Sequence, residues 1–316
     1  MDRPVNVVIF ASREKIPTLT ETILCAINSV PDGSVIDVLI NGNQELAEQI
    51  AREVVSPLSS ETKPYFVWSI PVADKGNAWN QHIHEIWRGE LNAVYIDGYV
   101  RVTREAIAAI SHTFASEAAA LGTSGVPTSG ASAKAIRRQM AKQGGFHGNL
   151  CAIKSWALEQ IRARGIRIPT GMYRVDSIMG AFLSFGLDNQ THEWDPFRFL
   201  PLTHAASWRC DKKKWYRFQD VVAWNSRRDR QARGDIENAA VKFHLADSKI
   251  LPEGLPQDVR SLILSWSETC PSDARNVTFR SKRHAQAMAF IHGYAVPAPG
   301  DLCARQVFTP KPKPAV

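Results

Sequence analysis

The sequence has no apolar run near the roughly 20 residues that a membrane-spanning helix requires. Cysteine is scarce, with five residues in the whole chain: Cys25, Cys151, Cys210, Cys270 and Cys303. Their number is odd and no two have the CxxC spacing of a zinc site, so we expect free thiols in a reducing compartment. Residues 1–4 lack the charged-then-apolar order of a signal peptide. These absences together predict a cytoplasmic protein.

Several common catalytic signatures are missing as well. There is no GxGxxG after the first apolar segment and no phosphate loop ending in GK[ST], which disfavours a dinucleotide oxidoreductase and an ATPase. The absence of GxSxG disfavours a serine hydrolase. No RNA-recognition, helix-turn-helix or zinc-finger pattern occurs, so we expect no nucleic-acid partner although the net charge is +7.

The positive charge does predict an anionic partner of some kind. Much of it lies between Arg209 and Arg233, a segment that also contains tryptophan. The segment is compatible with a clamp for a diphosphate, with docking on an anionic membrane that presents a lipid-linked acceptor, or with a solvated helix face. The sequence leaves these three alternatives open.

Apolar strands and amphipathic helices alternate through the first half of the chain. We predict strands at residues 5–10, 35–40, 65–70 and 93–96, and helices at 19–30, 45–55, 77–87 and 103–114, with later helices at 134–142, up to 163, and at 175–185. Residues 122–130 are rich in Gly, Ser and Thr and are predicted to form a loop. This order predicts an α/β fold with a mostly parallel sheet flanked by helices.

The strand-helix rhythm ends near residue 200. We expect three parts: residues 1–207 as a nucleotide-sugar-binding and catalytic domain, 208–308 as a mainly helical extension, and 309–316 as a disordered tail.

Ligands of such sheets bind outside the carboxyl ends of the strands. Four polar segments are predicted there, at residues 11–15, 41–43, 73–77 and 97–99. The last begins with Asp97, a lone carboxylate delivered by the apolar run Val94–Ile96 and followed at once by Gly98. Taken alone, Asp97 also fits a carboxylate that merely ends a strand.

The order of these segments resembles that of the family-2 glycosyltransferases, which have the GT-A fold. The resemblance covers roughly residues 5–210 and rests on several short motifs in the same order. Residues 9–14 resemble the family's opening strand and loop, and residues 75–80 its Lys-Gly-x-Ala-x-x-Asn segment. The resemblance implies that the donor nucleotide is bordered by Ala11, Arg13, Glu14, Asn41, Lys75, Asn80 and Asp97. Asn41 replaces an aspartate there, which leaves the base open between uracil and guanine.

Asp97 lies where the family carries its Asp-x-Asp motif, and Tyr99 stands in place of the second aspartate. The motif implies a divalent cation, Mn²⁺ or Mg²⁺, bound by Asp97. His204, in a segment that resembles a family histidine after a strand, is the expected second ligand, and an imidazole suits Mn²⁺ better. Without a completed ligand set, metal binding is weak or the chain is inactive.

Two further segments match the acceptor side of the family. Residues 145–153 resemble its glycine-rich stretch, where His147 is either a hydrogen-bonding group or a solvent-facing loop residue. Asp176 lies where the family has a Glu-Asp pair whose aspartate is the general base of inverting members, although Val175 replaces the glutamate. On local sequence, Asp176 is equally compatible with an ordinary helix start.

The resemblance implies a metal-dependent, inverting glycosyltransferase that moves a sugar from a UDP- or GDP-sugar to a glycan or lipid-linked acceptor, in polysaccharide synthesis. It implies a cytoplasmic location, with contact to the inner face of the membrane as one option. The alternative is a degenerate GT-A domain that binds a nucleotide sugar or glycan without turnover, which the replacements at Tyr99 and Val175 favour.

Overall fold

A computed structural model describes residues 3–58, 62–130, 132–211 and 218–309 of the 316-residue chain. Its centre is one nine-stranded sheet of order β5-β8-β6-β7-β4-β1-β2-β3-β9. The strands are β1 (Asn6–Ala11), β2 (Val35–Asn41), β3 (Tyr65–Ile70), β4 (Ala93–Asp97), β5 (Arg101–Val102), β6 (Gly122–Pro127), β7 (Leu150–Ile153), β8 (Leu202–Arg209) and β9 (Arg305–Phe308). The α/β fold class is confirmed.

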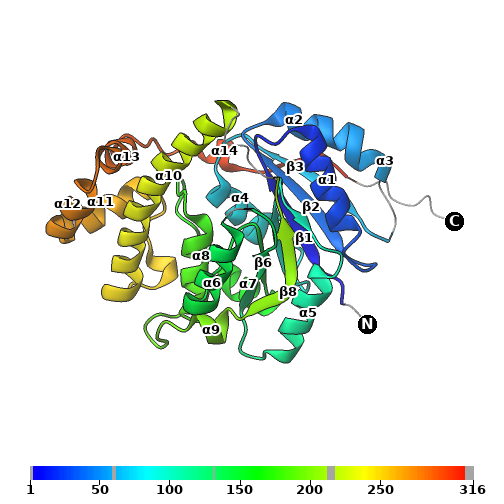
Figure 1. The fold of residues 1–316 in the computed structure, drawn as a ribbon, viewed down its shortest axis with the longest axis horizontal. Helices are drawn as coiled ribbons and strands as arrows, with labels where there is room; N and C mark the ends of the chain where they lie inside the picture. The colour runs from blue at the N-terminus through cyan, green and yellow to red at the C-terminus, as the bar shows by residue number, and fades with distance from the viewer. Residues whose placement is uncertain (1–2, 59–61, 131, 212–217, 310–316) are drawn as a thin grey trace.

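Helices lie against both faces and at one end of this sheet (Figure 1). They are α1 (Ile16–Ile27), α2 (Gln44–Ile50), α3 (Ser56–Leu58), α4 (Lys75–Gln81), α5 (Ala106–Ser116), α6 (Ala133–Gln143), α7 (Ser155–Ala163), α8 (Val175–Ser184), α9 (Pro196–Phe199), α10 (Phe218–Lys242), α11 (Val259–Thr269), α12 (Pro271–Thr278), α13 (Lys282–His292) and α14 (Pro299–Leu302). Short π-helical segments, η1 (Ala51–Val55), η2 (His82–Ile86) and η3 (Phe243–Asp247), extend α2, α4 and α10, and η4 (Pro252–Gly254) is a 3₁₀ turn. No helix in these described residues is long and apolar enough to cross a membrane.

The parallel part of the sheet is the run β3-β2-β1-β4. Every residue of β1 is buried, and its side chains alternate between two hydrophobic clusters. Val7 and Ile9 pack with the face covered by α1, α2 and α5, whereas Val8 and Phe10 pack with the face covered by α4, α7 and α8. Burial on both faces explains the nearly continuous apolar runs that predicted these strands.

The other half of the sheet is mixed. β7 is antiparallel to both β4 and β6, β8 is parallel to β6, and β5 is antiparallel to β8. Parallel pairing is therefore continuous over the four strands from β3 to β4, and the outer strands contain one more parallel pair, β6 with β8, among antiparallel ones.

The predicted loop at residues 122–130 was wrong, because it contains the buried strand β6. The glycine in the middle of β6 is explained by neighbouring atoms that leave no room for a side chain, and not by a turn. A Cβ on Gly125 would lie 2.6 Å from the carbonyl oxygen of Ala206 and 2.6 Å from Leu150. The buried hydroxyl of Thr123 donates a hydrogen bond to the carbonyl of Pro201 at 2.6 Å.

The part predicted as a helical extension joins the rest of the protein at two places. Ile236 of α10 and Leu262 of α11 belong to the same hydrophobic cluster as Phe182 of α8. After α14 the chain returns to the sheet, where β9 pairs antiparallel with β3 (Figure 1). The extension is therefore not wholly helical, since it supplies an edge strand.

Candidate functional site

Asp97 is the last residue of β4 and is 9% exposed. The N–H of Gly98 continues the pairing with β1 by donating to the carbonyl of Phe10 at 2.7 Å, and the chain then turns, with the N–H of Val100 donating to the carbonyl of Asp97 at 2.9 Å. A Cβ on Gly98 would lie 3.0 Å from both Ala11 and the carbonyl oxygen of Phe10. Glycine at this position therefore lets the residue after β4 pack closely against the end of β1, where Ala11 is its neighbour.

Both carboxylate oxygens of Asp97 have partners. The ammonium of Lys75 donates to Oδ1, and the hydroxyl of Tyr99 donates to Oδ2 at 3.1 Å. The same hydroxyl lies 3.1 Å from Oδ1 of Asn149. Burial of the hydroxyl, followed by the charge of Asp97, raises the pKa of Tyr99 far above its ordinary value, so this side chain is a neutral phenol.

Lys75 is the first residue of α4 and is held between two carboxylates. Burial alone lowers the pKa of Lys75, but Asp97 and Asp176 outweigh burial and hold that pKa above its ordinary value. Lys75 is therefore a cation at neutral pH. The helix that carries it is fixed at its start, because Asp74 accepts from the N–H of Asn77 at 3.0 Å and from that of Gly171 at 2.6 Å.

Asp176 lies in the first turn of α8, where the helix dipole favours a negative charge. Its Oδ2 accepts from the N–H of Gly148 at 3.2 Å, and its Oδ1 accepts from the N–H of Ser177 at 3.1 Å. A Cβ on Gly148 would lie 3.2 Å from the ammonium nitrogen of Lys75 and 3.5 Å from Oδ2 of Asp176. The predicted residues Asp97, Lys75 and Asp176 thus meet around one glycine, from three distant parts of the chain.

His147 borders the same cluster. Its Nδ1 accepts from the N–H of Asn149 at 3.3 Å, and its ring centroid lies 5.2 Å from that of Trp208. Burial lowers the pKa of His147, against the opposing effect of Asp176 and Asp97, so the ring is neutral at pH 7. A solvent-facing loop position for His147 was thus the wrong alternative.

His204 is not brought to Asp97. Ser124 of β6 pairs with Leu202 of β8, but Val126, two residues later, pairs with Ser207, five residues later. The extra residues of β8 form a bulge that contains His204, and His204 is exposed. β8 is three strand positions from β4, which places the two backbones about 14 Å apart. The expected pairing of His204 with Asp97 on one metal ion is wrong for this geometry.

The end of β8 supplies other residues to the site. The Sγ atom of Cys210 lies 3.8 Å from Nδ2 of Asn149, and burial together with Asp97 raises the pKa of this thiol to about 11. Sequence reasoning missed Asn149 and Cys210. Asn149 precedes β7, whose antiparallel pairing with β4 puts the carbonyl of Asn149 3.4 Å from the backbone nitrogen of Asp97, and this pairing is visible only in the structure.

Two further residues that were predicted to contact the nucleotide, Asn41 and Asn80, form hydrogen bonds with other parts of the protein. With its amide oriented to suit both neighbours, Asn41 donates to Ala11 at 2.7 Å and accepts from the N–H of Asp74 at 3.2 Å. Asn80 exchanges two hydrogen bonds with the backbone of Ile168, at 2.8 and 2.9 Å.

The loop after β1 is arranged by Glu14. Its Oε2 accepts from the N–H groups of Ser12 and Arg13 at 2.6 and 3.0 Å, while the Arg13 side chain is exposed. Glu14 also lines a cavity of about 360 Å³ beside this loop, together with Lys15 and Asn43. Their role at a nucleotide base stays a prediction.

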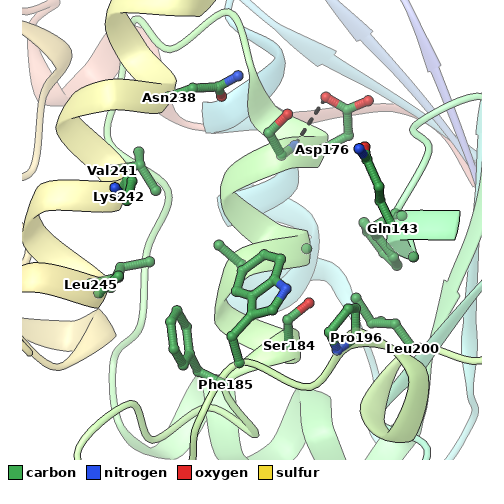
Figure 2. A pocket seen from close by; sticks show the side chains of 18 residues that line it. Gln143, Asp176, Ser184, Phe185, Pro196, Leu200, Asn238, Val241, Lys242 and Leu245 are labelled. Carbon is green, nitrogen blue, oxygen red and sulfur yellow. Dashed lines mark hydrogen bonds between the residues drawn. The ribbon is translucent and has the colours of Figure 1, made fainter. Parts of the chain in front are cut away.

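A larger groove of about 650 Å³ opens on the other side of Asp176. It is bounded by α8, by α10 and by the segments that carry Phe146 and Trp194, and Figure 2 shows Asp176 at one end with Phe185 at the other. Half of its lining residues are apolar: Phe146, Ala181, Phe185, Trp194, Pro196, Leu200, Val241, Leu245 and Ala246. The polar lining residues are Gln143, Asp176, Ser177, Ser184, Asn238 and Lys242. Asp176 therefore lies between the polar cluster and an apolar groove.

The donor atoms do not make a metal site. Across the described ranges, no three His, Cys, Asp or Glu side chains are grouped closely enough to hold a metal ion. Asp97 is bound to an ammonium and a phenol, and a divalent cation needs several oxygen ligands. Within the described ranges, the protein side chains alone therefore do not supply the ligand set of the expected Mn²⁺ or Mg²⁺.

No protein-family model and no curated protein matches the chain. Among solved structures, it is similar to the mannosyltransferase PcManGT from Pyrobaculum calidifontis in complex with GDP-Man and Mn²⁺, at 16% identity, covering 92% of this chain and 84% of that one with a TM-score of 0.49. It is also similar to TarS 1–349 of S. aureus in complex with UDP-GlcNAc, at 10% identity, 91% and 80% coverage and a TM-score of 0.48.

A third similar structure is GalNAc-T7 with UDP, GalNAc and Mn²⁺, at 10% identity and a TM-score of 0.47. The match covers 88% of this chain and 58% of that one. Likeness of this degree concerns the general path of the chain, so the chemistry has to be argued from the site itself.

Proposed function

We propose that the protein is a glycosyltransferase that moves a sugar from a UDP- or GDP-sugar to an acceptor hydroxyl, with Asp176 as the general base. One observation supports this most directly. Asp176 is shared between a polar cluster, formed with Lys75 and Asp97, and an apolar groove. A base for glycosyl transfer must reach both the donor and the acceptor, and Asp176 has that position.

The reaction we propose is a single displacement with inversion at the anomeric carbon. The acceptor oxygen forms its bond to that carbon while the bond from the carbon to the diphosphate oxygen breaks, and the leaving diphosphate takes the electron pair. Oδ of Asp176 takes the hydroxyl proton. Hydrogen bonds from Gly148 and Ser177 keep this carboxylate in place, which lowers the entropic cost of the proton transfer.

The groove favours an acceptor with an apolar part, so a lipid-linked acceptor suits it better than a bare glycan. Trp194 is 52% exposed at its rim and can cover a sugar or an acyl chain. We place the protein in the cytoplasm, peripheral to the inner face of the membrane, in glycan or polysaccharide synthesis. The predicted basic segment is in part outside the described residues, so its membrane role stays a prediction.

The test is transfer by wild type and by Asp176→Asn. Released nucleoside diphosphate is measured with a panel of UDP- and GDP-sugars and with lipid-linked acceptors, and donor binding is measured by thermal shift. Loss of the base predicts a rate lower by about 10²- to 10⁴-fold with unchanged donor binding. Full transfer by Asp176→Asn contradicts the assignment.

A second candidate is a domain that binds a nucleotide sugar without turnover. The neutral phenol of Tyr99, in place of a carboxylate, supports it. Donor binding by wild type with no transfer and no hydrolysis under any condition favours this candidate over the enzyme.

A further inference from the structure

The leaving group of the proposed reaction requires a fixed positive charge. A nucleotide diphosphate is anionic when it binds and gains negative charge as the glycosidic bond breaks, so a cation aimed at it stabilises the transition state. A divalent metal ion is one solution. In this protein the carboxylate at the end of β4 is already paired, and the position two residues on carries a phenol.

The cation beside the Asp97 carboxylate is the ammonium of Lys75. It contacts Oδ1 of Asp97 and lies 5.8 Å from the centre of the Phe10 ring. Its side chain is 33% exposed, so an anion can reach it. An ammonium has three N–H donors. Within the described residues, the ammonium of Lys75 donates to Asp97, which leaves donors for phosphate oxygens.

The position of Lys75 is fixed by its helix at both ends. Asp74 caps α4 and bonds to Gly171, and Asn80 bonds twice to the backbone of Ile168. A lysine on an anchored helix loses less entropy on binding an anion than one on a mobile loop.

Resting on the proposed function, we propose that Lys75 supplies the charge that a divalent cation would supply, and that donor binding by this protein is independent of metal. The second carboxylate of a metal motif is then dispensable, which explains Tyr99 next to a paired Asp97. Besides Lys75, Arg174 contributes positive charge near this cluster. The electrostatic effect of Arg174 reaches His147 in this cluster, as that of Lys75 does.

The first experiment measures binding of UDP and GDP to wild type by calorimetry, in EDTA and in Mn²⁺, with uridine and guanosine as phosphate-free controls. We expect binding of at least one diphosphate with dissociation constants that agree within about twofold between the two conditions. Binding that is at least about tenfold tighter in Mn²⁺ overturns the proposal. Absence of binding in both conditions overturns it as well.

Two substitutions locate the charge. Lys75→Met keeps the length of the stem and removes the cation, and we expect it to weaken diphosphate binding at least about tenfold and to leave the nucleoside unaffected. Lys75→Arg keeps the charge and should bind within about threefold of wild type. Because Lys75→Met leaves Asp97 without its cationic partner, the double variant Lys75→Met/Asp97→Asn serves as a second, charge-balanced test. Equal binding by all three variants and wild type overturns the proposal.

The converse substitution is Tyr99→Asp, which adds a second carboxylate beside Asp97. We expect this variant to acquire a Mn²⁺ response that wild type lacks, seen as a rise in Tm on adding Mn²⁺ alone. The same rise in wild type contradicts the inference. Failure of the inference is distinct from failure of the proposed function, because transfer that occurs only with Mn²⁺ retains the enzyme and rejects the role of Lys75.

Discussion

Glu237 on α10 accepts a 2.8 Å hydrogen bond from the backbone N–H of Arg174, two residues before Asp176. The same carboxylate is fully buried and also accepts from the N–H of Tyr173 at 3.0 Å and from Nε of Arg233 at 2.8 Å. A side chain from the C-terminal helices thus fixes the chain where α8 begins. The position of the proposed base therefore depends on residues that sequence comparison with the motifs did not single out.

We expect Glu237→Gln to lower the free energy of unfolding by about 2–3 kcal/mol, because a buried carboxylate that accepts from three donors is replaced by a neutral amide. Urea denaturation measures the change. Glu253→Gln is the matched control, since it breaks a half-exposed pair with Arg164 far along the chain and should cost less than about 1 kcal/mol. Equal stability of the two variants contradicts the role given to Glu237.

Gly148→Ala is expected to disturb the site without unfolding it. The added Cβ would lie 3.2 Å from the ammonium of Lys75 and 3.3 Å from Cβ of Asp176, which is closer than these atoms tolerate without moving. A displacement of this kind costs about tenfold to hundredfold in kcat/KM. Initial rates and Tm are measured together. Gly300→Ala, with no atom within 4 Å of its Cβ, should change neither, and an unaltered rate for Gly148→Ala speaks against the convergence of these groups.

Trp194→Ala tests the groove as the acceptor side. Trp194 packs edge-on against Phe185 at a centroid distance of 5.3 Å, and its loss removes part of the apolar wall. We expect KM for an apolar acceptor to rise about tenfold, with hydrolysis of the donor unchanged. Trp156→Ala on α7 is the control, because Trp156 is 53% exposed and lies outside the groove. A similar change in KM from both variants removes the groove from the acceptor site.

The stability of the sheet should fall in mild acid because of His82. Its ring is buried between Tyr95, at 3.1 Å, and Asn6, at 2.8 Å, and burial lowers the pKa of His82 from 6.5 to about 4. Between these two values the unfolded chain binds a proton that the folded chain rejects, so stability is present above pH 6.5 and is lost as the pH falls toward 4. The loss amounts to about 3 kcal/mol.

Urea denaturation of wild type and His82→Gln at pH 7, 5 and 4 measures this contribution. The advantage of wild type over the variant should shrink by about 3 kcal/mol across that range, since glutamine does not titrate. A difference that stays constant with pH rejects the assignment to His82.

The strands from β1 to β4 could be predicted within one or two residues because each is a mainly apolar run. β6 could not, since Gly125 and its neighbours have the composition of a loop. The close approach of Leu150 and of the carbonyl of Ala206 explains Gly125, and only the structure reveals it. β7 has four residues and β9 follows a long helical region, so neither carries a periodic signal.

In the site, Lys75, Asp97 and Asp176 lie close together, and each lies at the start or end of a regular element, where the order of the motifs could locate it. Their roles stay predictions. The prediction for His204 failed because a bulge changes the register of β8, and no local sequence feature marks that bulge. Glu237 was missed because its role depends on tertiary packing alone.

The pairing of β9 with β3 has a consequence for how the protein is made. Val67 pairs with Phe308, so the edge of the sheet at β3 stays unpaired on the ribosome until residues 305–308 have been translated. Nascent chains of this protein that stop short of β9 therefore expose an edge strand that can pair with other chains.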